Sequence, residues 1–437
     1  MSAQLLLSPT AMAVCVFSIL LVPLAGTGLA LINSGLGRSR SAAHTLMASL
    51  CVMAVAAVAY FICGFAWQGF SGLPSYAATV RGRPWGWIST GHFFLRDVAF
   101  NGSGASLAAW FGMLSAGLAA LIPIGSGAER WRLRACCAST VLLAAWTFPL
   151  FAHWVWGGGW LAELGANCGL GQGFLDAGGS GTIQAVGGLT ALSIAWILGP
   201  RRGKYAAGNM PAAIPGHNAV FVLFGCLLAL VGWTGLNSAG SILFMGVGPG
   251  RLALIGINTL LAAAMGALAA AGMTLTRFGK PDASLTANGW ISGLVASSAG
   301  CAFITPGAAA LIGLVGGGLA ARSVEWLESR LGVDDPGGAV SVHAVGGLWG
   351  VMAVGFFAHF PAGANLNGSR QWVAQLVGVA TLLGFVFPLT YGLNCLLNRF
   401  YPYRVEPEGE RQGLDLYELG AGAYPEFITH TDEFTLG

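Results

Sequence analysis

Long apolar segments alternate with short polar connections along most of the chain. A helix needs about 20 mainly apolar residues to cross a bilayer. Eleven segments come close to this requirement, and they cover residues 11–33, 41–66, 102–124, 136–156, 181–199, 216–237, 252–274, 284–303, 306–322, 338–358 and 372–397. The pattern predicts an all-α membrane protein with eleven transmembrane helices, a multi-pass protein of the cell membrane.

The composition agrees with this environment. Of the 437 residues, 55% are hydrophobic and only 8% are charged, whereas a soluble domain usually carries about 25% charged residues. The 68 glycines suit membrane helices, because small residues let helix backbones approach closely. The nine cysteines form neither a disulfide framework nor a metal-ligand pattern, so we expect no metal and no cofactor.

The distribution of lysine and arginine predicts the orientation. Fifteen of them lie on one side of the predicted spans and five on the other, at Arg81, Arg83, Arg96, Arg251 and Arg370. Cytoplasmic loops carry the excess of positive residues, so the N-terminus is expected outside and the C-terminus in the cytoplasm. This orientation requires an odd number of spans. The basic residues occur in groups of one to three, which the topology explains, so nucleic-acid binding is not expected.

The predicted spans divide the chain into a membrane domain, residues 1–397, and a polar cytoplasmic tail, residues 398–437. Within the membrane domain, Thr182–Leu189 and Ser341–Leu348 are identical at five of eight positions. We interpret this as an internal repeat of five spans each, about 11–199 and 216–358, followed by a last helix at about 372–397. Because five is odd, the two copies would be inverted, as in many transporters. Chance similarity between helices rich in glycine, alanine and valine is the alternative.

The repeat aligns Gln184 with His343, and both lie deep in apolar segments. An ionisable residue inside a membrane is a functional candidate, although a buried histidine can also simply bond to a neighbouring polar group. A neutral imidazole has one donor and one acceptor and can relay a proton. A glutamine amide offers a donor and an acceptor but carries no proton at physiological pH. The pair therefore predicts a polar path at the seam between the repeats.

A tryptophan-rich segment, Ala152–Trp160, follows the fourth predicted span at its outer end. The face of a tryptophan ring attracts a desolvated cation, which makes Trp156 a candidate for cation recruitment. Tryptophan is also common at membrane interfaces for its own sake. The spacing does not separate the two interpretations, because both place the ring at the same depth.

Short motifs follow one another over nearly the whole chain in a characteristic order and spacing. They include Gly35–Ser39, Ala128–Arg130, His153–Trp156, Asp176–Gln184, Gly199–Arg201, Gly232–Asn237, Ala287–Gly289, Gly332–Pro336 and Tyr403–Glu406. Together they resemble the Amt/Mep/Rh ammonium transporter family, on its Amt side. The resemblance implies an eleven-helix inverted-repeat fold, a homotrimer with one pore in each subunit, and ammonium or ammonia as the substrate of nitrogen uptake. It also implies a cytoplasmic tail that bears on regulation by PII-type signal proteins.

The resemblance further implies a pore gated by stacked phenylalanines and lined by two facing histidines. Here the first histidine position is Gln184, and the second is His343. The two gate phenylalanines fall at Ser115 and Leu236. All four are therefore predicted to line the pore, and three depart from the family pattern.

The outer recruitment site departs less from the family pattern than the pore does. Trp156 of the aromatic cage is present, and Asp176 matches the aspartate that steadies the site without binding the cation directly. The serine of the family site falls at Gly240, with Ser238 close by as a candidate replacement.

Three functions fit this sequence. The first is ammonium transport with altered proton coupling, because Gln184 replaces one pore histidine. The second is an electroneutral channel for ammonia, and the third is a sensor or regulatory relative that binds ammonium without transporting it. An enzyme is not expected, because His343 lacks a nucleophile at a suitable spacing. No phosphate-binding Gly-Lys-Ser/Thr loop occurs, so ATP-driven transport is not expected either.

Overall fold

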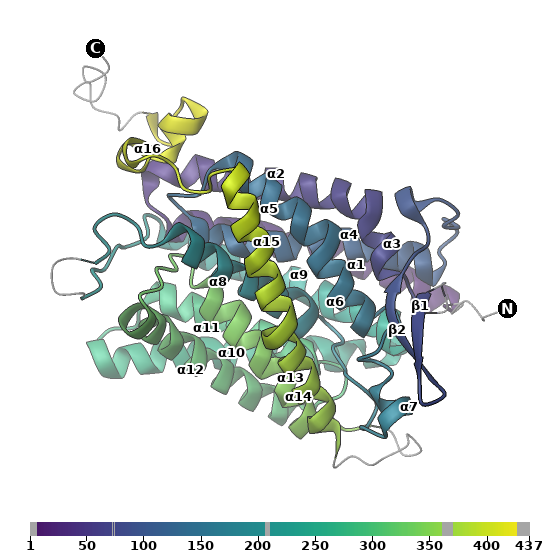
Figure 1. Cartoon of the computed structure of the whole chain (residues 1–437). Helices are drawn as coiled ribbons and strands as arrows, with labels where there is room; N and C mark the ends of the chain where they lie inside the picture. The colour runs from purple at the N-terminus through teal and green to yellow at the C-terminus, as the bar shows by residue number, and fades with distance from the viewer. Residues whose placement is uncertain (1–6, 72, 74, 206–209, 361–369, 426–437) are drawn as a thin grey trace.

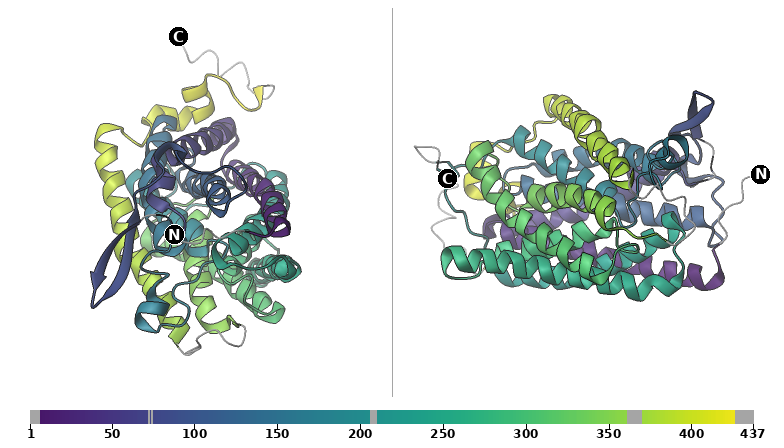
Figure 2. Two further views of the ribbon diagram at one scale, coloured as in Figure 1. Left: turned by 90° about the vertical axis from the view of Figure 1, so that its right-hand side faces the viewer. Right: turned by 90° about the horizontal axis from the view of Figure 1, so that it is seen from below.

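The computed structural model describes residues 7–71, 73, 75–205, 210–360 and 370–425. Long helices run side by side along one direction and form a bundle (Figure 1). One end carries strands β1 (Ser75–Val80) and β2 (Arg83–Ser89) and helix α7 (Leu164–Cys168), and it is called the hairpin end. The opposite end, with helix α16 (Pro407–Gln412), is called the tail end. The views in Figure 2 place the N-terminus at the hairpin end and the C-terminus at the tail end.

Most of the chain is helical. The helices of the first half are α1 (Pro9–Leu36), α2 (Ala42–Ala59), η2 (Tyr60–Gly64), α3 (Phe65–Gln68), α4 (Gly104–Gly127), α5 (Leu133–Leu142), η4 (Leu143–Thr147), α6 (Phe148–Val155), α7 (Leu164–Cys168), η5 (Ser180–Ala185) and α8 (Val186–Leu198). Those of the second half are α9 (Ala219–Met245), α10 (Leu252–Phe278), α11 (Ala283–Ser298), α12 (Pro306–Leu331), η7 (Val340–Val345), α13 (Gly346–Phe357), α14 (Gln371–Thr381), η9 (Leu382–Val386), α15 (Phe387–Phe400), α16 (Pro407–Gln412) and η10 (Asp415–Leu419). Three single-turn helices complete the set, η1 (Ser39–Ser41), η3 (Phe93–Leu95) and η6 (Pro249–Arg251).

Ten helical segments of the described chain are long and apolar enough to cross a membrane. The remaining predicted span, 284–303, corresponds to α11, which has 16 residues and is shorter than the roughly 20 that a span usually needs. The break after it is the start of α12, where the Thr305 hydroxyl accepts a hydrogen bond from Ala308 N and Pro306 opens the helix. The number eleven and the orientation of the chain stay predictions.

A β-hairpin interrupts the all-α architecture and was not predicted. Strands β1 (Ser75–Val80) and β2 (Arg83–Ser89) pair antiparallel. They are joined by Arg81 and Gly82, whose φ angles of 53° and 75° are both left-handed, as a tight two-residue hairpin turn requires. Because the hairpin is short and largely exposed, its sequence lacks the alternation of a half-buried strand.

The described part of the tail, up to residue 425, folds back onto the bundle. Arg404 pairs in an isolated bridge with Trp131, and the Asp415 carboxylate accepts hydrogen bonds from Ala43 N and His44 N at the start of α2. An acidic group at a helix N-terminus satisfies free backbone donors and complements the helix dipole. These contacts hold this segment against the helices of the bundle.

Candidate functional site

Gln184 and His343 meet in the interior of the bundle. Gln184 lies on η5 and His343 on η7, and His343 Nδ1 is 2.7 Å from Gln184 Oε1. Gln184 is completely buried and His343 is 4% exposed. Two positions that are 159 residues apart in the chain are thus in direct contact.

The same local structure holds both residues. Asp176 accepts hydrogen bonds from the backbone N–H groups of Gly179, Gly181 and Thr182 at the start of η5. Asp335 accepts hydrogen bonds from Ala339 N and Val340 N at the start of η7. In each copy the aspartate precedes the polar residue by eight positions. The correspondence supports the internal repeat and identifies Asp335, not the adjacent aspartate, as the partner of Asp176.

The repeated glycines bring the two helices together. A Cβ at Gly188 would lie against the backbone nitrogen of Ala344, and a Cβ at Gly347 would lie 2.5 Å from the backbone oxygen of Ser180. Only glycine allows this separation, since real Cβ atoms essentially never approach other atoms so closely. The Gly-Gly pairs of the repeat therefore bring η5 and η7 close enough for the Gln184–His343 contact.

The contact assigns hydrogen-bonding roles. An amide oxygen can only accept, so the proton of the neutral His343 ring lies on Nδ1 and Nε2 is left as an acceptor. The Gln184 amide nitrogen is buried and has no hydrogen-bond partner among the described residues. The pair thus leaves an unpaired amide NH₂ group, with two N–H donors, on Gln184 and one acceptor on His343.

The predicted gate positions lie in the same interior. Ser115 on α4 and Leu236 on α9 are both completely buried. Within the described chain the Ser115 hydroxyl has no hydrogen-bond partner, which is unusual for a buried polar group. Compared with a phenylalanine, a serine at position 115 is smaller and leaves a hydroxyl without a partner in the described chain.

The predicted recruitment residues are only partly brought together. Trp156 follows α6, and its indole N–H donates a 2.7 Å hydrogen bond to the backbone oxygen of Asp176. A Cβ at Gly240 would lie against the backbone oxygen of Ala177, so α9 packs too closely there to present a serine. Ser238 is two residues away, which turns its side chain about 160° from position 240 around the helix.

Two aromatic residues at this site were missed by sequence reasoning. Phe244 stacks on Trp156 with ring centroids 4.5 Å apart and planes 3° from parallel. Phe111 contacts both rings edge-on, at 5.8 Å from Trp156 and 5.6 Å from Phe244. The signal was present in the helical spacing. Phe111 is one turn before Ser115, and Phe244 is two turns after Leu236, on the same helix faces.

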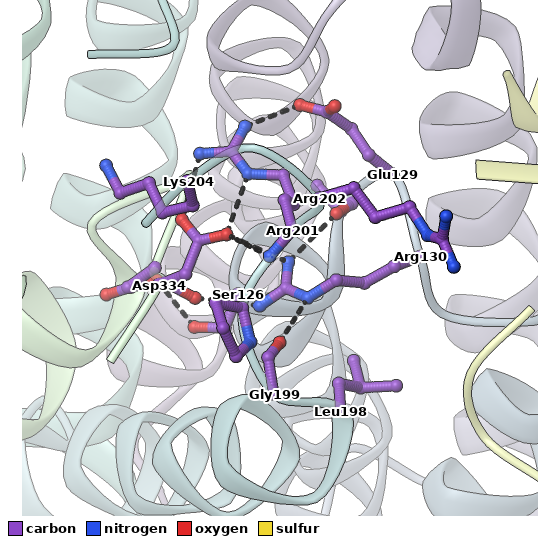
Figure 3. A network of polar contacts seen from close by, with 12 residues as sticks. Ser126, Glu129, Arg130, Leu198, Gly199, Arg201, Arg202, Lys204 and Asp334 are labelled. Atoms are coloured by element: carbon purple, nitrogen blue, oxygen red, sulfur yellow. Dashed lines mark hydrogen bonds and ion pairs between the residues drawn. The ribbon is translucent and has the colours of Figure 1, made fainter. Parts of the chain in front are cut away.

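A second buried polar cluster lies nearer the tail end and consists of ion pairs (Figure 3). The Arg201 guanidinium lies between Asp334, at 2.9 Å, and Glu129, at 2.6 Å. Burial by itself would raise the pKa of the Asp334 carboxyl, but hydrogen bonds from Arg201 and the charge of Arg130 lower it from 3.8 to about 2. Burial is also the largest influence on Arg130 and lowers its pKa to about 10.

This charged cluster ties loops together. Arg130 donates to the backbone oxygens of Gly199 and Asp334, which joins three connections between helices. The Lys204 ammonium pairs with Glu328 at 2.6 Å. The pairing of these buried charges indicates a structural role. Across the described residues, no group of three or more His, Cys, Asp or Glu side chains could hold a metal ion.

Comparison with known proteins agrees with this geometry. Residues 13–424 match the model of the Ammonium Transporter Family. Among curated relatives, Ammonium transporter Amt2 of Archaeoglobus fulgidus is 36% identical over 429 residues, covering 94% of this chain and 87% of that protein. The ammonium transporter of Bacillus subtilis is 32% identical, covering 94% of this chain and 97% of that protein.

Solved structures resemble the fold over the same extent. A protein described as a sensor Amt protein has a TM-score of 0.83 and 30% identity, covering 93% of this chain and 98% of that chain. Mep2 of Saccharomyces cerevisiae has a TM-score of 0.79 and 27% identity, covering 93% of this chain and 89% of that chain. With its apolar helices and a polar pair buried in its interior, this multi-pass integral membrane protein belongs to the ammonium transporter family.

Proposed function

We propose that this protein conducts ammonium or ammonia along a path from Trp156, past Ser115 and Leu236, to the pair formed by Gln184 and His343. The observation that carries the proposal is the 2.7 Å contact between Gln184 and His343, deep in a chain that belongs to the ammonium transporter family. Asp176 would act by position, because its backbone oxygen accepts from the Trp156 indole and its carboxylate accepts from Thr182 N at the start of η5. Ser238 remains a candidate for the recruitment site.

Proton coupling in this pore would differ from a path lined by two imidazoles. Ammonium that sheds its proton crosses an apolar pore as neutral ammonia, which avoids the cost of burying a charge. If the proton follows by a separate relay, one positive charge crosses with each ammonia. An imidazole can pass a proton between its two nitrogens, whereas the amide of Gln184 cannot. The relay would therefore stop at Gln184, and the proton would stay on the side it came from.

The hydrogen-bonding pattern favours an electroneutral path. Ammonia has both N–H donors and a lone pair, so it can accept from the Gln184 amide and donate to His343 Nε2. Ammonium has donors only, and the unpaired amide N–H groups of Gln184 face it as further donors. The seam would therefore accommodate the neutral molecule better than the cation.

The orientation and assembly are further parts of the proposal. The excess of basic residues favours eleven spans with the hairpin end outside and the tail end in the cytoplasm. Residues 1–397 would then form the membrane domain and 398–437 the tail. A homotrimer with one pore in each subunit, and a PII-type signal protein at the tail, follow from family membership and are proposed for this chain.

The test compares wild type with Gln184→His in proteoliposomes. Ammonium-evoked current reports movement of charge, and stopped-flow measurement of internal pH reports entry of ammonia. We expect wild type to show ammonia entry with little current, and Gln184→His to gain current, because the second imidazole restores a relay. Gln184→Leu, which removes the amide donor, is the matched control and should gain no current.

The other outcomes decide between the alternatives. Current of equal size and pH dependence in wild type and Gln184→His would show that the relay argument does not apply. A protein that binds ammonium but gives neither current nor ammonia entry would be a sensor or regulatory relative. Failure to rescue growth of a cell that lacks ammonium uptake would be an early sign of that role.

A further inference from the structure

Phe244 covers one face of the Trp156 indole. Its ring lies parallel to Trp156, with centroids 4.5 Å apart. Carbon atoms in van der Waals contact are already about 3.5–4.0 Å apart, so no cation fits between the two rings. Trp156 is 3% exposed, whereas Phe244 is only half-buried.

The packing around Phe244 explains why it can hold this position. Phe111 meets Phe244 edge-on at 5.6 Å, and Phe70 lies 6.2 Å from it on another side. Edge-on and stacked ring pairs are both favourable arrangements. Phe244 is in the last turn of α9, and the glycine after that turn, Gly246, has no atom within 4 Å of where a Cβ would lie. The turn that carries Phe244 is thus free of close packing at its end.

The rings compete with a cation on similar terms. An aromatic pair and a cation–π contact at a partly exposed site have stabilisations of the same order. A cation can therefore displace Phe244. Because the ring stacking must be broken first, the apparent affinity of Trp156 for the cation falls by a factor that corresponds to the stacking free energy. The two predicted gate positions hold Ser115 and Leu236, neither of which is aromatic. An aromatic ring that closes the path near the hairpin end would therefore come from another position, that of Phe244.

We infer that Phe244 is a lid on the outer recruitment site, which competes with ammonium for the indole face of Trp156 and sets the concentration at which the pore fills. This inference rests on the proposed function only in placing the cation at Trp156. The lid would lower the affinity for ammonium and methylammonium alike, because it covers the face before any selection at the seam occurs. Entry would require rotation of the half-buried Phe244 side chain away from the indole.

The test measures ammonium dependence in wild type and in Phe244→Ala. We expect the half-saturating concentration for ammonia entry to fall about fivefold in Phe244→Ala, because the stacked ring no longer competes. Phe244→Leu keeps most of the bulk without the stacking and should give a smaller fall. Phe100→Ala is the control, because Phe100 is 71% exposed, and it should match wild type.

A second measurement does not depend on transport. Ammonium chloride should raise the thermal unfolding midpoint of the detergent-solubilised protein more than sodium chloride at equal concentration, and the excess should be larger in Phe244→Ala, because a bound ligand stabilises the folded state. In a Trp156→Leu background, Phe244→Ala should have no effect on this excess.

The outcomes separate the lid from the transport function. Absence of flux in every variant would refute the proposed function, and the thermal measurement alone would then test the lid. An unchanged or raised half-saturating concentration in Phe244→Ala, or an unchanged excess stabilisation where flux is absent, would overturn the lid. An effect that persists without the indole would also overturn it, because Phe244 would then act without covering Trp156.

Discussion

Two buried polar regions of this protein differ in how completely they are paired. In the charged cluster near the tail end, Arg201 contacts both Glu129 and Asp334, and Arg130 donates to three backbone oxygens. At the seam, Gln184 and His343 make one hydrogen bond, and the amide nitrogen stays unpaired among described residues.

The difference shows which buried polar groups are free to act. A charge whose partners are all protein groups has little capacity for a ligand, and losing one partner leaves a buried charge uncompensated. A buried donor without a protein partner has a cost that folding alone does not explain. We therefore expect the charged cluster to stabilise the fold, and we propose that the seam serves transport.

The largest predicted effect is on the charged cluster. Asp334→Asn should lower the free energy of unfolding by about 3–5 kcal/mol, because it leaves the Arg201 charge without its main partner. The matched control is Glu325→Gln, whose ion pair with Arg277 is 40% and 52% exposed on the two side chains, and it should cost about 0–1 kcal/mol. Thermal unfolding in detergent measures both. Equal shifts of the unfolding midpoint in the two variants would contradict the distinction between a fully paired buried charge and an exposed ion pair.

An intermediate effect is expected with pH. The pKa of Asp334 falls on folding, from 3.8 to about 2, so its contribution is complete above pH 4 and is lost as the pH falls towards 2. The contribution is about 2 kcal/mol by linkage. The difference in unfolding midpoint between wild type and Asp334→Asn should therefore narrow below about pH 4. A difference that stays constant down to about pH 3 would mean that the carboxylate is not held ionised by Arg201.

The smallest effect compares two buried serines on α4. The Ser126 hydroxyl donates to the Asp335 carboxylate at 2.6 Å, so Ser126→Ala should cost about 1.5 kcal/mol of stability. Ser115 has no hydrogen-bond partner in the described chain, so Ser115→Ala should cost about 0.5 kcal/mol or less. Thermal unfolding and ammonia entry, measured on both variants, distinguish a serine that stabilises the fold from one that acts in transport. A larger loss of stability in Ser115→Ala would show that the hydroxyl is structural.

The sequence predicted much of the fold because membrane helices are specified locally. Apolar length by itself located ten helices that the structure confirms among the described residues. The β-hairpin was missed because its turn depends on left-handed φ angles at Arg81 and Gly82, which leave no hydrophobic pattern. The predicted span 284–303 extends beyond the end of α11 at Ser298, because apolar residues continue past its last helical turn.

The candidate site was predicted in part for a similar reason. The repeat aligned Gln184 with His343, and the two residues are in contact in the structure. Phe244 was missed because an aromatic residue on an apolar helix looks the same whether it faces lipid, core or pore. Only the packing of α9 against the segment that carries Trp156 distinguishes these cases.

The sequence by itself determined the apolar helices, the repeat, the family resemblance and the replacement of a pore histidine by Gln184. Each of these depends on residue identity and spacing along the chain. Only the tertiary structure decided which atoms of Gln184 and His343 meet, that Asp335 is the counterpart of Asp176, and that Phe244 covers Trp156. These facts depend on how helices from distant parts of the chain approach one another, and the glycines at 188 and 347 set that approach.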